Sequence, residues 1–210
     1  LLEQYIVQPD RALLKQAVLA AVTDARRFGL VGAHTMEGSA SWSILEELRN
    51  EGLNFRFTWH FPLDDLDSMI SKGIKSYSGD EWLKIGGVKI FADGALGSQT
   101  AAMFEPYTGS RDCGILRYTD AELHEIGVKA ASNGIAITIH GIGDKAVNQI
   151  LRLFKDLKPY PGLLNRIEHV QSIRSEDLLL LKESGAACAV QPVHLANDVE
   201  MIEKHWQTVR

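Results

Sequence analysis

The sequence has 210 residues, of which 45% are hydrophobic and 23% charged, and its formal net charge is −5. This composition is that of a globular protein with enough apolar residues for a sizeable core, and a single domain is expected. The scattered lysines and arginines form no basic stripe, which argues against nucleic acid as a partner. No apolar run reaches the roughly 18 residues of a membrane span, so a membrane protein is not expected either.

The two cysteines and the ends of the chain bear on its context. Cys113 and Cys188 stand in unrelated surroundings, which suggests a reducing compartment, the cytoplasm, rather than a disulfide framework. The sequence begins "LLEQYIVQPD", without an initiator methionine or a signal peptide, and ends on the polar helical pattern "EKHWQTVR". We therefore expect a segment cut from a longer protein.

Apolar strands alternate with amphipathic helices along the chain. Helices are predicted at residues 10–28, 41–52, 63–73, 119–133, 145–157 and 175–185. Their hydrophobic faces and flanking polar residues suggest Asp10, Thr119 or Asp120, and Ser175 as the N-caps of the first, fourth and last helix. Strands are predicted to end near residues 35, 60, 91, 140, 169 and 192.

This alternation predicts βαβ units and a parallel sheet covered on both faces. A doubly wound sheet and a (β/α)₈ barrel both fit, but no G-x-G-x-x-G fingerprint follows the first strand. Polar residues recur at the carboxyl ends of the strands, where barrels carry their catalytic groups. These residues are His34, His60, Lys89, His140, His169 and His194. A barrel has eight strands and about 250 residues, so the sequence is two units short.

The longest irregular stretch runs over residues 93–118 and is rich in small and polar residues. A loop of that length in a compact domain is usually functional or disordered, and this composition suits a loop that covers a substrate.

Lys89 is unusual because it lies inside the apolar strand "GVKIF", where an unpaired ammonium is costly to bury. His140 ends the strand "AITI" and His169 ends "RIEH". A single histidine in such a place is more often a hydrogen-bonded core residue than a ligand. Three such side chains on successive strands favour a metal site, since neutral imidazole is a common ligand of zinc. A buried, deprotonated lysine can also react with carbon dioxide to give a carbamate that bridges two metal ions.

Two other interpretations remain open from the residues alone. A desolvated lysine on a barrel strand can form a Schiff base with a carbonyl substrate. The chain can equally be a non-catalytic remnant whose strand-end histidines are idle. His34 and His60 are either hydrogen-bonded locally or in contact with substrate, whereas His124 and His205 are expected on the solvent-exposed surface.

Four motifs together resemble one family. "VKIFADGALGSQTAAMFEPY", "TIHGIGDKAV", "NRIEHVQ" and "VQPVHL" are similar, in this order, to segments of the YtcJ-like branch of the amidohydrolase superfamily, which includes N-substituted formamide deformylases. The resemblance implies an incomplete (β/α)₈ barrel that spans residues 1–210 and holds strands two to seven. Strand one, strand eight and the β-sandwich domain of the family would be absent.

The resemblance also implies an activity and its residues. It implies a metal-dependent hydrolase of amide-like C–N bonds that uses a metal-bound hydroxide and one or two divalent ions, with zinc as the expected metal. Lys89, as a carbamate, and His140 and His169 match the metal ligands. Asp93, Gln99, His34 and His194 match positions expected to bind substrate, and Arg166 and Glu168 flank the strand-six histidine, which they would orient.

The sequence departs from the family in several places, among them strand two, which ends "AHT" where relatives commonly carry "HD". It contains no H-x-H pair, which holds the first metal in the family, and the essential aspartate of strand eight would follow Arg210. We therefore expect no catalytic acid or base within the chain and no activity of these residues alone. The expected partner is a small amide-like substrate, with neither nucleic acid nor membrane. A homodimer is expected to cover the open strand edges.

Overall fold

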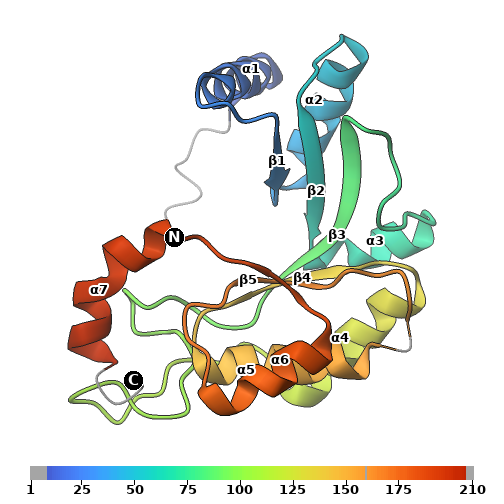
Figure 1. Cartoon of the computed structure of the whole chain (residues 1–210). Helices are drawn as coiled ribbons and strands as arrows, with labels where there is room; N and C mark the ends of the chain where they lie inside the picture. The colour runs from blue at the N-terminus through green and yellow to red at the C-terminus, as the bar shows by residue number, and fades with distance from the viewer. Residues whose placement is uncertain (1–8, 159, 207–210) are drawn as a thin grey trace. The chain divides into compact units, whose positions relative to one another are not determined.

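Figure 1 shows the computed structural model of the chain, which describes residues 9–158 and 160–206. Contacts divide the chain into two compact parts. The N-terminal part consists of Leu1–Pro62 and Tyr77–Gly86, and the C-terminal part of Leu63–Ser76 and Gly87–Arg210.

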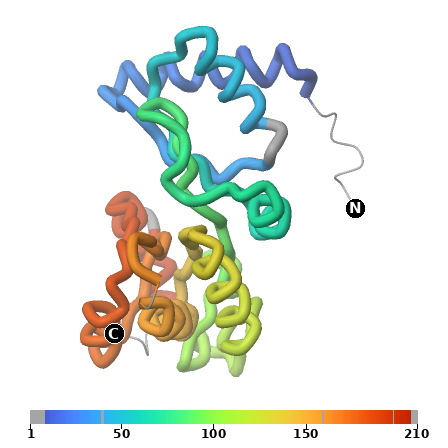
Figure 2. The backbone as a smooth tube through the Cα atoms, turned by 90° about the vertical axis from the view of Figure 1, so that its right-hand side faces the viewer, coloured from blue at the N-terminus to red at the C-terminus, as the bar shows by residue number. Residues whose placement is uncertain are grey.

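The N-terminal part combines two helices with parallel strands. Its elements are α1 (Arg11–Arg27), β1 (Gly32–Thr35), α2 (Ser39–Asn50), β2 (Arg56–Pro62) and the first residues of β3 (Leu83–Phe91). β1 pairs with β2 in parallel, with His34 opposite Thr58. The two helices lie next to each other (Figure 2). The carboxylate of Asp10 accepts a hydrogen bond of 2.8 Å from the backbone N–H of Leu13, which confirms it as the N-cap of α1.

The C-terminal part continues the same alternation. After η2 (Leu63–Asp65) and α3 (Leu66–Ser71), its elements are the rest of β3, α4 (Asp120–Ser132), β4 (Ile137–Gly141), α5 (Asp144–Asp156), β5 (Arg166–His169), η3 (Ser175–Asp177), α6 (Leu178–Ser184), β6 (Ala187–Ala189) and α7 (Val193–His205). Helices α4, α5 and α6 cover one face of β4 and β5 (Figure 1). The strand side chains on that face form the core and are at most 1% exposed; they are Val88, Ile90, Ile137, Ile139 and Ile167.

The strand order confirms the predicted fold class. β3 takes part in both halves of the chain, and the sheet runs β1-β2-β3-β4-β5-β6, so that each strand lies beside its predecessor in the sequence. A doubly wound sheet would reverse its order at a switch point, whereas consecutive βα units of a barrel do not. The chain is therefore an α/β protein with six successive strands of a (β/α)₈-type barrel.

The second face of β3, β4 and β5 is polar. Strand alternation places Lys89, His140 and Glu168 on this face, opposite the face covered by the helices. The parallel register sets Phe91 beside His140 and His140 beside Glu168. The apolar side chains of the same strands form the core on the other face. The side chains on the polar face are therefore available to bind a ligand or to react.

The long segment between β3 and α4 contains no helix or strand, as the sequence predicts. An apolar cluster fixes it against the end of α7, and this cluster consists of Leu96, Ala101, Met103, Tyr107, Ile142 and Trp206. His205 precedes Trp206 and is only 7% exposed, with Nδ1 3.0 Å from Nε2 of Gln99. The prediction that His205 is solvated is therefore wrong, because α7 packs on the loop. His124 is exposed, as expected.

Two predicted element boundaries also differ. Ser175 begins the short η3 and does not cap the α-helix, which starts only at Leu178. The last strand ends at Ala189 rather than near residue 192, and Pro192 stands at the N-cap of α7 with φ −57°. Proline has no N–H for a strand ladder and its φ suits the start of a helix, so His194 lies in the first turn of α7. The last four residues of the predicted terminal helical pattern lie outside the described residues.

Thr119 closes a capping box at the start of α4. Its hydroxyl accepts from the N–H of Glu122, whose carboxylate accepts from the N–H of Thr119. Thr119→Ala is expected to lower the free energy of unfolding by about 1 kcal/mol, because the N–H of Glu122 loses the hydroxyl oxygen that accepts its hydrogen bond. Urea unfolding measures this difference. Ser132→Ala, at the other end of the same helix, is the control and should change the value by less than about 0.5 kcal/mol. Equal effects of the two substitutions would contradict the role of the box.

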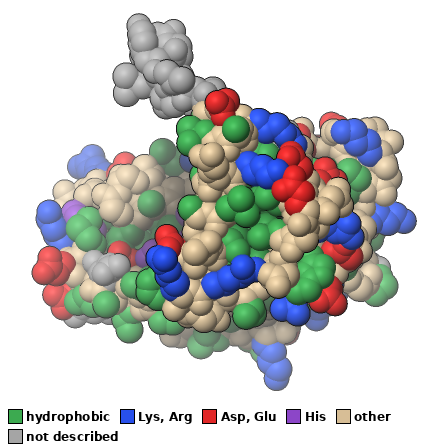
Figure 3. All heavy atoms as spheres, turned by 90° about the horizontal axis from the view of Figure 1, so that it is seen from above, with side chains coloured by type: hydrophobic (Ala, Val, Ile, Leu, Met, Phe, Trp, Pro, Cys, Tyr) green, Lys and Arg blue, Asp and Glu red, His purple; other side chains and the backbone are tan. Residues whose placement is uncertain are grey.

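The surface shows mixed character. On the face in Figure 3, basic and acidic side chains alternate with apolar ones, and the described residues there form no basic stripe. None of the helices within residues 9–158 and 160–206 has the length and apolar character needed to cross a membrane. Cys113 and Cys188 are both free thiols.

Candidate functional site

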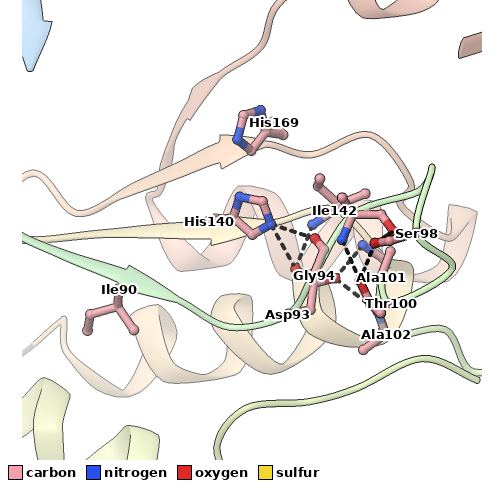
Figure 4. Close-up of polar contacts among 12 residues, drawn as sticks. Ile90, Asp93, Gly94, Ser98, Thr100, Ala101, Ala102, His140, Ile142 and His169 are labelled. Carbon is pink, nitrogen blue, oxygen red and sulfur yellow. Dashed lines mark hydrogen bonds and ion pairs between the residues drawn. The ribbon is translucent and has the colours of Figure 1, made fainter. Parts of the chain in front are cut away.

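Lys89, His140 and His169 come together in the C-terminal part from three neighbouring strands. Each lies within the last three residues of its strand: β3, β4 and β5 respectively. The rings of His140 and His169 are 4.8 Å apart between centroids, and Figure 4 shows one above the other. Lys89 Nζ lies 3.8 Å from the centroid of the Phe91 ring, which is 5.3 Å from that of His140. The three side chains singled out from the sequence therefore form one cluster.

Lys89 is buried with little to compensate its charge. It is 6% exposed, and its Nζ donates to the backbone carbonyl of Ile90 at 3.1 Å. Burial lowers the pKa of Lys89 to about 8, against the attraction of Glu168. With that pKa, roughly a tenth of the amine is neutral at pH 7. Lys89 is thus able to act as a nucleophile toward an electrophilic carbon.

His140 is held in one tautomer by its contacts. Its Nε2 lies 2.7 Å from the carbonyl oxygen of Gly94 and 3.4 Å from Oδ1 of Asp93. Because a carbonyl oxygen only accepts, Nε2 carries the proton and Nδ1 carries the lone pair. Burial lowers the pKa of His140 to about 4, so the ring is neutral at pH 7. His140 therefore presents an unprotonated nitrogen on the side away from Gly94.

His169 is oriented in the same way by a different partner. Its Nδ1 lies 2.8 Å from Oε1 of Gln191, an acceptor, so Nδ1 carries the proton and Nε2 the lone pair. Burial also lowers the pKa of His169. The pair of contacts at His140 and His169 matches the usual arrangement of ligating histidines, in which one ring nitrogen donates to an oxygen and the other binds metal.

The backbone at the end of β5 turns His169 toward His140. Regular alternation would place His169 on the face of Ile167, against the helices. Instead, His169 has φ 78° and Val170 has φ 49°. Positive φ is uncommon outside glycine and a real outlier for a β-branched residue, and such strain concentrates at functional sites. No sequence pattern predicts this turn.

The neighbouring charged pair lies on the same face. Arg166 and Glu168 are 2.6 Å apart between Nε and Oε1, and Glu168 is 6% exposed. Glu168 lies beside His140 in the parallel register. The suggested role of both residues in orienting His169, at the end of β5, stays a prediction.

Asp93 and Gln99, predicted to bind substrate, are engaged within the loop. The carboxylate of Asp93 is fully buried and accepts three backbone hydrogen bonds. Burial raises the pKa of Asp93 to about 6, against these three donors. Gln99, with φ 55°, contacts His205. Their predicted contact with substrate stays a prediction, and the contacts present give them a structural role.

His194 lies beside the cluster on α7. Its ring centroid is 5.7 Å from that of His169, and its Nδ1 is 3.6 Å from Oδ2 of Asp198. A cavity of about 180 Å³ borders His169, Gln191, His194 and Asp198. The predicted contact between His194 and a substrate would lie in this cavity.

His34 and His60 form a separate pair within the N-terminal part. Nδ1 of His34 lies 3.2 Å from Nε2 of His60, and the rings stack with centroids 5.5 Å apart. His60 is 4% exposed, and Gly86 leaves the room for it, since a Cβ on Gly86 would come 2.4 Å from the imidazole Cε1. The interpretation of these two residues as locally hydrogen-bonded fits this contact.

Without modification, the clustered side chains supply only part of a metal-ligand set. Among the described residues, no group of three or more histidine, cysteine, aspartate or glutamate side chains is placed to hold an ion. His140 and His169 supply two nitrogen lone pairs, and the third nearby group is Lys89, whose ammonium is not a ligand. A carbamate on Lys89 would supply an anionic oxygen and complete three protein ligands, the number common in catalytic zinc sites.

Sequence reasoning missed two parts of this arrangement. Gln191 orients His169, and the only trace of it in the sequence is its position in "VQPVHL". The carbonyl of Gly94 orients His140, and a backbone oxygen leaves no sequence signal.

The strand order and the lysine and histidines at the strand ends define a barrel of the metal-dependent hydrolase type. The chain belongs to the amidohydrolase family, which matches it over residues 1–210.

Relatives support the same assignment. The chain is 34% identical over 128 residues to LONG AFTER FAR-RED 3 of Arabidopsis thaliana, covering 59% of this chain and 22% of that protein. It is 28% identical over 189 residues to "Putative amidohydrolase YtcJ" of Bacillus subtilis, covering 87% of this chain and 36% of that protein. The resemblance to the YtcJ-like branch is confirmed. The chain thus spans 22% and 36% of the lengths of these relatives.

Two solved structures are similar in fold and sequence. An uncharacterized metal-dependent hydrolase from Pyrococcus furiosus matches with a TM-score of 0.81 and 29% identity, over 90% of this chain and 40% of that one. Another from Pyrococcus horikoshii OT3 matches with a TM-score of 0.81 and 30% identity, over 91% and 39%. Both support the barrel fold, and both proteins are described as metal-dependent hydrolases.

Proposed function

We propose that this amidohydrolase-family chain contributes the ligands of one metal ion to an enzyme that hydrolyses amide-like C–N bonds in a small substrate. The observation that carries the proposal is the pair of oriented lone pairs, Nδ1 of His140 and Nε2 of His169, beside the buried Lys89. Two neutral imidazoles and a lysine of lowered pKa are difficult to explain by core packing alone.

The residues would divide the work as follows. His140 and His169 would hold a divalent cation, with zinc the first candidate. Lys89 would attack carbon dioxide through its neutral amine, forming an N–C bond and losing one N–H proton to water, and the resulting carbamate oxygen would be the third ligand. A bound divalent ion lowers the pKa of water and polarises a carbonyl oxygen, which is the chemistry that amide hydrolysis needs. Gly94 and Gln191 would keep the two imidazoles in place.

A Schiff base on Lys89 is the second candidate, favoured by the lowered pKa of its amine. The two chemistries are separable. Borohydride in the presence of a carbonyl substrate would trap a Schiff base as a stable adduct on Lys89, whereas metal binding that depends on bicarbonate supports the carbamate. The two histidines beside Lys89 favour the hydrolase.

Zinc binding tests the proposal directly. We expect the 210-residue chain to bind zinc more tightly with bicarbonate than without it, measured by competition with a chromophoric chelator and by elemental analysis after gel filtration. His140→Ala and His169→Ala should each weaken binding by about 10-fold or more, since each removes one ligand. His124→Ala, on the exposed face of α4, is the matched control and should bind as the wild type does. Equal loss in all three variants, or no zinc bound with bicarbonate, would contradict the proposed site.

The activity of the isolated chain, its assembly and its location are the subject of further proposals. Because the sequence contains no H-x-H pair, we propose that the chain alone does not turn over an amide. A homodimer that covers the strand edges and a cytoplasmic location are further proposals, made from the strand edges and from the two cysteines respectively.

A further inference from the structure

Asp93 stands at the centre of a network of backbone hydrogen bonds directly after β3. Its Oδ2 accepts from the N–H of Ala102 at 2.9 Å and from that of Gly143 at 2.8 Å. Its Oδ1 accepts from the N–H of Ile142 at 3.1 Å. The side chain is 0% exposed, and Figure 4 draws its contacts. Both carboxylate oxygens therefore accept backbone hydrogen bonds, and the side chain has no exposure to solvent.

The three donors come from two segments far apart in the sequence. Ala102 belongs to the long loop after β3, whereas Ile142 and Gly143 form the turn from β4 into α5. The carbonyl of Ala102 in turn accepts from the N–H of Lys145 at 3.1 Å in the first turn of α5. Asp93 thereby fixes the turn that begins two residues after His140.

Asp93 also fixes the group that holds the His140 ring. Gly94 is its immediate neighbour, and the carbonyl of Gly94 lies 2.7 Å from Nε2 of His140. Oδ1 of Asp93 lies 3.4 Å from the same nitrogen. Gly94 itself is tightly packed, since a Cβ there would come 2.0 Å from the hydroxyl of Thr100. The ring of His140 is thus held on its Nε2 side by two neighbouring oxygens, while its other nitrogen faces His169 (Figure 4).

We infer that Asp93 is a positioning residue of the metal site: it places the Gly94 carbonyl and the β4–α5 turn so that His140 keeps its proton on Nε2 and offers Nδ1 to a cation. The inference rests on the proposed function for its consequence, although the tautomer of His140 is a property of the metal-free chain. It assigns Asp93 a role without contact to substrate, in agreement with its complete burial.

Asp93→Asn tests the inference with little change in shape. The amide keeps one acceptor oxygen but presents N–H groups where a backbone N–H already points, so at least one of the three hydrogen bonds is lost. The matched control is Asp144→Asn. Asp144 is also buried, at 2% exposure, and accepts from the N–H of Phe104 in the same loop at 2.9 Å, but it has no contact with His140. A purely structural effect on the loop should appear in both variants.

The first readout is the tautomer of His140 in the metal-free chain, measured from the ¹⁵N shifts of its ring. Wild type and Asp144→Asn should show the proton on Nε2, and Asp93→Asn should show a mixture of tautomers. The second readout is zinc affinity, which should fall by about 10- to 100-fold in Asp93→Asn and change little in Asp144→Asn. An unchanged tautomer in Asp93→Asn, or equal losses in both variants, would overturn the inference.

The two proposals fail separately. If the wild type binds no zinc but Asp93→Asn alone shifts the tautomer, the metal site is wrong and the positioning role stands. If zinc binds and Asp93→Asn leaves both readouts unchanged, the metal site stands and the positioning role of Asp93 is wrong. Should Asp93→Asn not fold, the wild type still decides: its Nε2–H signal must be visible and slow to exchange with water, and its absence would overturn the inference.

Discussion

Gly143→Ala is expected to lower the free energy of unfolding by about 3 kcal/mol or more, as an extreme case of overpacking. A Cβ at this position would come 2.0 Å from the carbonyl oxygen of Ala102 and 2.6 Å from its nitrogen. Both are backbone atoms that cannot move aside by a rotamer change. The φ of Gly143 is −74°, which alanine adopts readily, so the whole effect is steric.

The clash matters because it lies where Asp93 joins the two segments. Separating Ala102 from Gly143 would stretch the hydrogen bonds of both residues to one carboxylate oxygen, whose lengths are 2.9 and 2.8 Å. Urea unfolding gives the stability difference, and hydrogen exchange at these two amides shows whether the loop has opened. Gly97→Ala in the same loop is the control, with no atom within 4 Å of its Cβ. A change at Gly143 no larger than that at Gly97 would show that the close approach of the two backbones is absent in solution.

The elements that sequence analysis predicted correctly are those determined by neighbouring residues. The caps at Asp10 and Thr119 depend on side chains within three residues of the backbone they bond. The strands depend on apolar residues repeated within one segment. One error concerns packing between distant segments: His205 is buried because α7 meets a loop about a hundred residues earlier, which no local pattern contains. The errors at Ser175 and at the end of the last strand concern element boundaries instead.

In the candidate site too, the features determined by neighbouring residues were predictable and those determined by distant segments were not. Lys89 stood out in the sequence because a charge interrupted an apolar strand, and the structure places it with His140 and His169. The resemblance to the family matched Asp93 to a position expected to bind substrate, and that expectation stays a prediction. The partners of Asp93 in the structure are backbone N–H groups up to fifty residues away, and backbone groups are the same for every sequence. Only the fold reveals which of them converge on one carboxylate.

The buried Lys89 should cost stability that a neutral side chain recovers. In buffer free of metal and carbon dioxide at pH 7, Lys89→Met is expected to raise the free energy of unfolding by up to about 3 kcal/mol, the value that corresponds to a pKa lowered from 10.5 to about 8. Methionine has a similar length and flexibility, so little cavity is created. The same variant should lose all bicarbonate-dependent zinc binding. A gain in stability with a loss of metal is typical of a residue kept for function.

The pH dependence identifies the cause of that gain. The pKa of Lys89 is about 8 in the folded state, below the 10.5 of the unfolded chain, so both states are protonated below pH 8. Between these two values the unfolded state binds more protons, and the stability of the wild type rises with pH. The advantage of Lys89→Met is therefore full below pH 8 and disappears above pH 10.5. Lys84→Met, on the exposed start of the same strand, is the control and should follow the wild type throughout. An advantage of Lys89→Met that persists unchanged at high pH would attribute the gain to packing, and the lysine would then be an ordinary ammonium rather than the neutral amine that carbamate formation requires.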